Sequence, residues 1–439
     1  MNAQTMANLG AQQAWLTKTR NPSTFAWLVA IFAALVQAQD VLGFLDPCRG
    51  VVGCSSAVAL TTVLSATSLV SIVIASSFIY RDIANLFARN IANIAYIFLV
   101  VISISWSINP DVTFQRVIGC IMSMLVAAYF SVRFGEKDRM KVFSLFFAIS
   151  AIGSLLLVAA YPEQGTLDGD LMGLYLSKNV LGHTMAMAIL IELYLLVLDN
   201  WRPIWRFGLL STYLTLLILS HSLTSLICGA FYLAGTAVYI IGRRDKLMAI
   251  IVAITLGLPL LFLQLGLLYN ADLLLSFFGK DPSITGRADI WLESLDLIKQ
   301  KPLLGWGYMA TWRLDDLQFA LIMERLQWPT PNAHSAYIDV TLQLGAVGLG
   351  LLLTIIAIAS RRALACLRMG VPLGWFSLML LVGALTYSIV ETGLGQNQSI
   401  DWLLVNVFNF SCGLTLASLH RRGFEISYSR FVPSRSYPC

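Results

Sequence analysis

Long apolar runs separated by short polar connections dominate the chain. A helix that crosses a membrane needs roughly 20 mostly apolar residues, and helices satisfy their own backbone polar groups inside lipid. Such runs lie at residues 24–40, 57–79, 91–106, 112–132, 142–161, 173–198, 205–220, 222–242, 247–267, 335–359, 371–390 and 401–420. The pattern predicts an all-α polytopic membrane protein with about 12 transmembrane helices.

The connections between the runs alternate in charge. One set is basic and contains Lys18, Arg20, Arg81, Arg89, Arg133, Lys137, Arg139, Lys141, Arg202, Arg206, Arg243, Arg244, Lys246, Arg361, Arg362, Arg368, Arg421 and Arg422. The other set is acidic and contains Asp40, Asp46, Asp111, Glu163, Asp168, Asp170, Glu391 and Asp401, with Arg49 as an exposed cation among them. Because basic connections stay in the cytoplasm, we expect both termini there and an even number of spans.

One connection, residues 268–333, is much longer than the others and is placed outside by the same alternation. Loops of this length are uncommon unless they have a function. Ala288, Trp291, Leu295 and Ile298 recur in it at helical spacing, which predicts an amphipathic helix on the membrane or on the bundle. The predicted organisation is a cytoplasmic tail at 1–22, a transmembrane helical domain at 23–420 that includes this large periplasmic loop, and a polar cytoplasmic tail at 421–439.

The composition agrees with a membrane protein. Hydrophobic residues make up 57% of the chain and charged residues 12%, against roughly 45–50% and about 25% in soluble domains. The net charge of +5 does not indicate nucleic-acid binding, because the basic residues are spread over many short connections. Residues 1–22 are polar and no small-residue cleavage site follows the first run, so we expect that run to stay as a helix.

The seven cysteines include no CxxC pair and show no metal-ligand spacing. Cys48 and Cys54 share one outer connection. They are either a disulfide or two unlinked thiols, and the sequence leaves both alternatives open.

Six ionisable residues fall at or near the outer face, where such groups are costly and indicate function. Arg116 lies about one turn inside the fourth run, and Lys178 lies between one and two turns inside the sixth. His221 lies between the seventh and eighth runs, Arg287 and His334 lie in the large loop, and Glu391 lies at the end of the eleventh run. Each also has a structural explanation, such as a long side chain that extends to the interface. Their convergence on one face favours a joint function.

Cations at an outer membrane face suit an anionic ligand. Arginine binds phosphate bidentately and lysine acts as a point charge, while a histidine suits proton transfer from a hydroxyl. A lipid with a diphosphate head group satisfies these observations together. Its tail would lie between helices, and its charge would meet Arg116, Lys178 and Arg287.

Several short motifs resemble one family. They lie at 106–110 (WSINP) with Arg116 beyond, 173–179 (GLYLSKN), 220–225 (SHSLTS), 285–291 (TGRADIW), 301–307 (KPLLGWG), 331–337 (PNAHSAY), 344–349 (LGAVGL), and at Glu391 with Trp402 beyond. Their order, spacing and membrane side resemble the O-antigen ligase and polysaccharide polymerase superfamily over roughly residues 100–410, and its exopolysaccharide-production polymerase branch most closely. Many members carry Asn where this chain has Ser335, and Arg in the serine-rich turn where it has His221 and Leu223.

The resemblance implies an all-helical glycosyltransferase of the GT-C type in the bacterial inner membrane. Such proteins take a glycan from undecaprenyl diphosphate on the periplasmic side, without a metal or other cofactor. A polymerase passes it to the next lipid-linked repeat unit and a ligase passes it to lipid A-core; both remain open.

The same resemblance assigns roles to the six residues. Arg116, Arg287 and Lys178 would hold the diphosphate, and His221 would substitute for the missing arginine. His334 or Glu391 would deprotonate or orient the acceptor hydroxyl, and the better-matched motif favours His334.

A transporter of lipid-linked sugars or polysaccharide is the alternative from another class. Transporters place their charges near the membrane midplane, between repeated halves. The charges of this chain lie at one face, and its sequence shows no internal repeat. A structural membrane subunit would not explain the ordered Gly, Trp and Arg residues of the large loop.

Overall fold

The computed structural model describes residues 22–37, 58–167, 169–199, 203–269, 285–313, 316–326, 330–397 and 399–431. The helices are α2 (Thr24–Gln37), α3 (Val58–Ser77), α4 (Tyr80–Ala88), α5 (Ile91–Ile102), the 3₁₀ helix η2 (Ser103–Trp106), α6 (Pro110–Arg133), α7 (Glu136–Ala160), α8 (Pro162–Gly165), α9 (Lys178–Leu198), α10 (Trp205–Leu219), α11 (Leu223–Gly242), α12 (Lys246–Tyr269), α14 (Thr285–Gln300), α15 (Leu317–Leu326), α16 (Ala336–Arg368), α17 (Pro372–Val390) and α18 (Ile400–Phe431). Within these segments the strands form one antiparallel hairpin, β1 (Thr166–Leu167) with β2 (Asp170–Leu171). The prediction of an all-α protein is confirmed.

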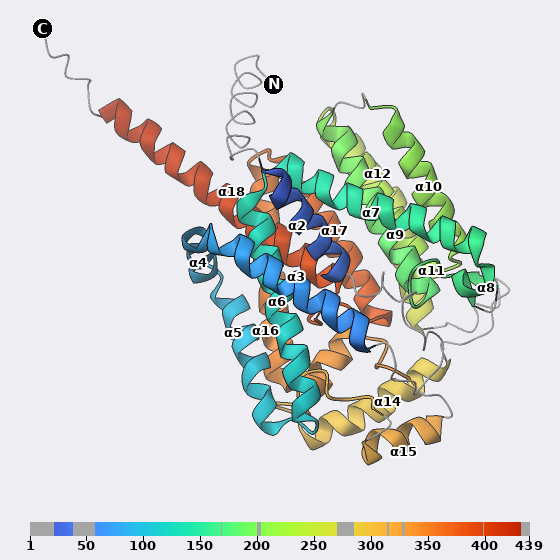
Figure 1. The fold of residues 1–439 in the computed structure, drawn as a ribbon. Coiled ribbons are helices and arrows are strands. Elements are labelled where there is room, and N and C mark those ends of the chain that lie inside the picture. The colour runs from blue at the N-terminus through green and yellow to red at the C-terminus, as the bar shows by residue number, and fades with distance from the viewer. Residues whose placement is uncertain are drawn as a thin grey trace, which may run out of the picture.

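Figure 1 shows long helices side by side, with α14 and α15 at the end of the bundle away from the last turns of α18. Eight described helices are long and apolar enough to cross a membrane: α6, α7, α9, α11, α12, α16, α17 and α18. α3 and α4 pass the same test together with a bend of 94° between them, and α2, α5 with η2, and α10 are shorter apolar helices. Each predicted run therefore contains a helix and the chain is a multi-pass membrane protein, whereas the count of twelve spans stays a prediction.

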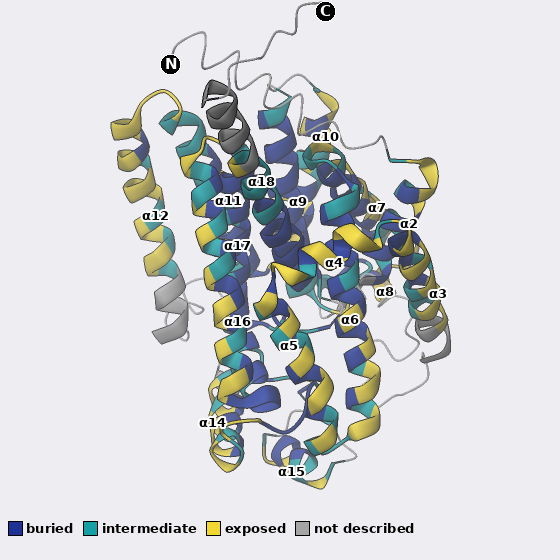
Figure 2. Cartoon of the chain, turned by 90° about the vertical axis from the view of Figure 1, so that its left-hand side faces the viewer, coloured by how far each residue is buried: buried dark blue, intermediate teal, exposed yellow. Residues whose placement is uncertain are grey.

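The central helix of the bundle is α9. Of the 18-residue window that qualifies it as a span, 94% is buried inside the protein, against 6% for α12. The exposed residues of α12 are visible along its length in Figure 2, and they are largely apolar, which suits a helix facing lipid. The polar side chains inside α9, those of His183, Thr184 and Glu192, are therefore shielded by the surrounding helices.

The start of α9 differs from the prediction. The sixth apolar run was expected to be helical from 173, but the helix begins at Lys178, after Ser177, whose hydroxyl accepts a hydrogen bond from Val180 N at 3.3 Å. Gly173 has a φ of +58°, a left-handed conformation that glycine adopts at low cost, and the chain before it forms the β1–β2 hairpin. Lys178 therefore lies at the first residue of the helix rather than one to two turns inside it.

The amphipathic helix predicted in the large loop is present as α14, but its buried face is rotated. Ile290, Ser294 and Leu297 are the buried residues, whereas Ala288 is exposed and Leu295 is 46% exposed. The buried face belongs to a second apolar cluster, shared with α15, the start of α16 and the loop between α14 and α15. The helix therefore packs on protein through a face that includes Ile298 of the predicted stripe but not Ala288 or Leu295.

The 302–307 loop is joined to a break in α16. The helix is interrupted at Gly345, where φ is +64°. Trp306 N donates to Leu342 O at 2.9 Å, and Ala346 N donates to Pro302 O at 2.8 Å, so the loop satisfies backbone groups that the break leaves without helical partners. A Cβ atom on Gly345 would lie 2.1 Å from the carbonyl oxygen of Leu303, which explains why glycine stands at this contact.

Some predictions fall outside the described residues, among them the pairing of Cys48 with Cys54 and most of the tail at 1–22. At the other end, α18 continues to Phe431, beyond the predicted boundary at 420. The first residues of α9 and α16 meet the end of α17 in one region, where the candidate site lies.

Candidate active site

Glu391 is the centre of the site. It follows the last residue of α17 as its C-cap. Its Oε1 accepts hydrogen bonds from Arg287 Nη2 at 2.7 Å and from Asn179 Nδ2 at 2.6 Å, and its Oε2 lies 3.2 Å from His334 Nδ1. Arg287 also donates from Nη1 to the carbonyl oxygen of Val390 at 2.6 Å. One carboxylate thus joins α9, α14, α17 and the turn before α16.

His334 is held by its own turn. Its φ is +48°, which is uncommon for a residue other than glycine and is maintained only where the surroundings enforce it. Here Trp291 Nε1 donates to Ala333 O at 2.9 Å, Ala333 N donates to Asp339 Oδ1 at 3.1 Å, and Ala336 N donates to Glu391 O at 3.1 Å. The backbone around the histidine is therefore tied to α14, α16 and the end of α17, which fixes the ring against Glu391.

The electrostatics of this cluster favour an ionised Glu391. The side chains of Glu391, Arg287 and His334 are only 12%, 15% and 15% exposed. Burial alone would raise the pKa of Glu391, but the hydrogen bond from His334 and the charge of Arg287 outweigh it and hold the pKa below its ordinary value. A carboxylate only accepts hydrogen bonds, so it places the proton of a neutral His334 ring on Nδ1 and the lone pair on Nε2.

A second carboxylate, Asp170 of β2, holds two more of the predicted residues. Lys178 forms an ion pair with Asp170, and His221 Nδ1 lies 2.9 Å from Asp170 Oδ1. Burial would raise the pKa of Asp170, but the hydrogen bonds and charges of Lys178 and His221 lower it below its ordinary value. The two permanent cations of the site, Lys178 and Arg287, are therefore each paired with a carboxylate, which the sequence analysis did not anticipate.

The serine-rich turn between α10 and α11 packs directly on the start of α9. Ser225 Oγ donates to Asn179 O at 3.2 Å. A Cβ on Gly182 would lie 2.5 Å from Ser220 Oγ, so the absence of a side chain there permits the close approach. This packing brings His221, at the tip of the turn, to the same end of α9 as Lys178 and Asn179.

Arg116 is the one predicted site residue that lies apart from this cluster. It is half-buried on α6, and its electrostatic neighbours are Tyr308 and Arg313 of the large loop. Among the described residues, it forms no hydrogen bond or ion pair with Glu391 or Asp170. Tyr308 OH donates to Gly395 O at 3.1 Å, so Arg116 is near the loop that follows Glu391 but not in contact with the cluster.

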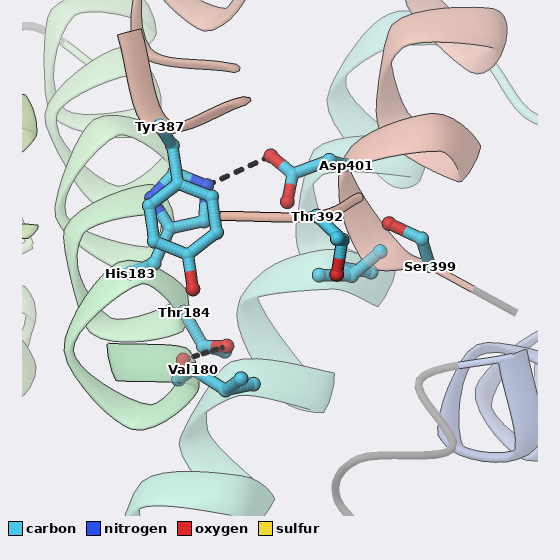
Figure 3. A pocket seen from close by; sticks show the side chains of 8 residues that line it. Val180, His183, Thr184, Tyr387, Thr392, Ser399 and Asp401 are labelled. Atoms are coloured by element: carbon cyan, nitrogen blue, oxygen red, sulfur yellow. Dashed lines mark hydrogen bonds and ion pairs between the residues drawn. The ribbon is translucent and has the colours of Figure 1, made fainter. Parts of the chain in front are cut away.

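Two features of the site were not predicted from the sequence: the contact of Asn179 with Glu391, and a buried pair one turn further along α9. His183 Nε2 lies 2.8 Å from Asp401 Oδ1, and its ring stacks on Tyr387 with centroids 3.7 Å apart. These residues line a small cavity, shown in Figure 3. The available signal was the spacing of Asn179 and His183, four residues apart and so on one helix face.

In the described part of the chain, no group of three or more His, Cys, Asp or Glu side chains is arranged to hold a metal ion. Instead, Glu391 and Asp170 each contact one permanent cation and one histidine. Such an arrangement can orient a histidine, hold an anionic group beside Arg287 and Lys178, and exchange a proton with a hydroxyl.

Comparison with known proteins shows which family a central part of the chain resembles. Residues 182–353 match the family model described as O-antigen ligase, a segment that contains His221, Arg287 and His334. The exopolysaccharide production protein ExoQ of Rhizobium meliloti (strain 1021) is 25% identical over 302 residues, which cover 64% of this chain and 66% of the relative, slightly under two thirds of its length. The chain is therefore similar, over part of its length, to the O-antigen ligase family and to an exopolysaccharide production protein.

Proposed function

We propose that this protein polymerises an exopolysaccharide or O-antigen by transferring a glycan from undecaprenyl diphosphate to a second lipid-linked glycan, at the periplasmic face of the bacterial inner membrane. The observation that carries the proposal is the contact of one buried carboxylate, Glu391, with both Arg287 and His334. Through Glu391, Arg287, which can bind phosphate, lies close to His334, which can accept a proton. The two groups are near enough to act on the same glycosidic bond.

His334 is the proposed base. The hydroxyl of the acceptor sugar gives its proton to His334 Nε2 and its oxygen bonds to the anomeric carbon of the donor. The bond from that carbon to the diphosphate oxygen breaks, and the diphosphate leaves with the electron pair. Glu391 is the positioning residue in this scheme, because three donors already occupy it and its pKa is lowered, which makes it a weak base. Its negative charge stabilises the imidazolium that forms.

Arg287 and Lys178 are the proposed contacts of the diphosphate, and His221 assists them. Arg287 presents a planar fork of donors, and its exposed fraction of 15% means that the charge acts in a medium of low dielectric constant. The diphosphate is already a good leaving group, so stabilising the charge that develops on it is the main requirement. Arg116, near Tyr308 and Arg313, would contribute a further positive charge from α6.

The positive-inside rule supports a periplasmic site. The site lies at the end of the bundle where α9 begins and α17 ends. The opposite ends carry the basic connections between α6 and α7, between α11 and α12, and between α16 and α17, which contain Arg133, Lys137, Arg243, Arg244 and Arg368. Basic connections stay in the cytoplasm, so the site faces the other compartment.

A ligase that transfers the glycan to lipid A-core is the second candidate, because the matching family model is described as O-antigen ligase. The name of the relative, an exopolysaccharide production protein, favours the polymerase. The two activities use the same donor chemistry and differ in the acceptor.

A size profile of lipid-linked and exported glycan tests the proposal. Cells lacking the gene are complemented with the parent or with His334→Ala. Accumulation of single repeat units and loss of long polymer, restored only by the parent, is the expected result for a polymerase. Long chains that persist on undecaprenyl diphosphate but never reach lipid A-core would identify a ligase, and a normal set of products would refute both.

A further inference from the structure

The segment that follows α14 in the large loop runs along the first turns of α16, the part of that helix before its break. Near the break, Trp306 N donates to Leu342 O at 2.9 Å. Further along the segment, Trp312 Nε1 donates to Asp339 Oδ1 at 3.1 Å. The segment therefore runs from the break in α16 toward the turn of His334, and its contact with Asp339 lies at the end nearer to that turn.

One oxygen of Asp339 joins this segment to the turn of His334. Asp339 Oδ1 accepts hydrogen bonds from Trp312 Nε1 and from Ala333 N, each at 3.1 Å. Asp339 and Ala333 are 0% exposed and Trp312 is 7% exposed. Both hydrogen bonds therefore lie away from water, in a medium of low dielectric constant where they are stronger. A change in the orientation of this carboxylate alters both contacts at once.

The two segments that Asp339 joins each contain a residue with an unfavourable backbone conformation. The φ angle is +61° at Trp312 and +48° at His334, the residue after Ala333. A positive φ is uncommon for residues other than glycine and persists only where the surroundings enforce it. Because Asp339 contacts both segments, it contributes to holding both conformations.

The second oxygen of Asp339 indicates that the carboxylate does more than stabilise the fold. Oδ2 is buried and has no hydrogen-bond partner among the described residues. A buried polar atom without a partner costs free energy, and apolar side chains of similar volume often replace buried charged groups without loss of stability. Local costs of this kind are found most often at functional sites.

We propose that Asp339 and Trp312 are positioning residues for His334. Trp312 fixes the carboxylate of Asp339, and Asp339 fixes Ala333 N and therefore the turn of His334. That turn sets the distance of 3.2 Å between His334 Nδ1 and Glu391 Oε2. The large loop thereby contributes to the reaction through the position of its base. Both roles rest on the proposed glycosyl transfer.

Two tryptophans of the large loop form a matched pair for the test. Trp306 and Trp312 are each 7% exposed, and each ring packs edge-on against Phe319. Each indole N–H donates one hydrogen bond of 3.1 Å, from Trp306 to Leu297 O and from Trp312 to Asp339 Oδ1. Phenylalanine at either position removes one indole donor and the same volume. The two variants therefore differ mainly in which acceptor loses its donor.

The assay is polymer formation from purified lipid-linked repeat units, with kcat, KM and the melting temperature measured for each variant. We expect Trp312→Phe to lower kcat about two- to tenfold with KM unchanged, because one buried hydrogen bond is lost. Trp306→Phe should have a similar melting temperature and the parental kcat. An equal fall of kcat in the two variants, or a parental kcat in Trp312→Phe, would overturn the proposed positioning.

Substitutions of Asp339 separate its acceptor oxygen from its charge. Asp339→Asn keeps an oxygen that can accept from Trp312 and Ala333, whereas Asp339→Leu has the same branched shape and no acceptor. We expect Asp339→Leu to lower kcat roughly ten- to hundredfold, because a small misplacement of a reacting group is costly. Asp339→Asn should lower kcat by less than about threefold. A fall as large in Asp339→Asn as in Asp339→Leu would contradict the role of this oxygen.

A structure of Trp312→Phe tests the positioning without any measurement of activity. Displacement of His334 Nδ1 from Glu391 supports it, whereas an unchanged contact there, together with an unchanged hydrogen bond from Ala333 N to Asp339, overturns it. A parent that makes no polymer in the assay refutes the proposed function instead, and the structural result still decides whether Trp312 and Asp339 hold the turn.

Discussion

Replacing Glu391 with glutamine preserves the size of the side chain and removes its charge, so it tests the carboxylate alone. The carboxylate accepts from Arg287 at 2.7 Å and from Asn179 at 2.6 Å through one oxygen, and meets His334 Nδ1 at 3.2 Å through the other. The amide oxygen can keep the first two hydrogen bonds. The amide nitrogen then faces Nδ1 as a donor, which moves the proton of the neutral imidazole to Nε2 and removes the lone pair from the atom proposed to act as base.

The expected size of this effect follows from the tautomer. A carboxylate-to-amide exchange behind a catalytic histidine lowers kcat by about 10⁴-fold in serine proteases, where the imidazole is likewise held in the wrong tautomer. We expect a fall in kcat of roughly 10³–10⁴-fold. Arg287 keeps its contact with Val390 O, so donor binding and KM should change little.

The assay is the rate of polymer formation from purified lipid-linked repeat units by protein in proteoliposomes. Glu163→Gln is the matched control, because Glu163 on α8 is exposed and undergoes the same chemical change. A melting temperature near that of the parent excludes a folding defect. If Glu391→Gln keeps a kcat within about threefold of the parent while Glu163→Gln is also active, Glu391 does not set the tautomer and the scheme must be abandoned.

Three further predictions concern other parts of the molecule. A lysine at position 287 cannot donate two parallel hydrogen bonds to Val390 and Glu391 as the guanidinium does. We therefore expect Arg287→Lys to weaken the binding of a polyprenyl diphosphate by roughly tenfold or more, measured by calorimetry. An unchanged affinity would exclude a contact between Arg287 and the diphosphate. Gly345→Ala places a Cβ 2.1 Å from a backbone oxygen at a φ of +64°, so we expect it to destabilise the protein by about 1–3 kcal/mol or more and to lower the melting temperature. The control is Gly350→Ala, whose Cβ would have no atom within 4 Å and which should leave the melting temperature unchanged. The pKa of Asp170 is lowered in the folded protein, so its ionised form stabilises the fold at pH values above the ordinary carboxyl pKa, and this stabilisation is lost as the pH falls through the folded pKa. The melting temperatures of the parent and Asp170→Asn should therefore converge on acidification. A difference that stays constant with pH would contradict this.

The sequence predicts the positions of helices well because each apolar run is long enough to be read without knowledge of its neighbours. It does not predict which side of a helix meets protein. On α14, Leu295 is apolar and 46% exposed, whereas Ser294 is buried. Apolar spacing cannot distinguish a face toward lipid from a face toward another helix, because both environments exclude water.

The site is predictable only in part for a related reason. Helix ends meet at each membrane face, so charged residues at helix ends on one face are expected to lie near one another. On this basis Lys178, Arg287 and Glu391 were predicted to lie in one region. Their partners depend on contacts between distant segments: His183 and Asp401 are 218 positions apart. The pairing of Lys178 with Asp170 depends on a hairpin that no apolar pattern indicates.

The break at Gly345 has a consequence for the order in which the chain is assembled in the membrane. Two backbone N–H groups and two carbonyl groups around it bond to residues 302–307, and each such group left unsatisfied in lipid costs several kcal/mol. We therefore expect α16 to reach its folded state only after residues 302–307 have packed on the break. Deletions in that loop should appear first as a failure of biogenesis of the last three helices, before any loss of catalysis can be measured.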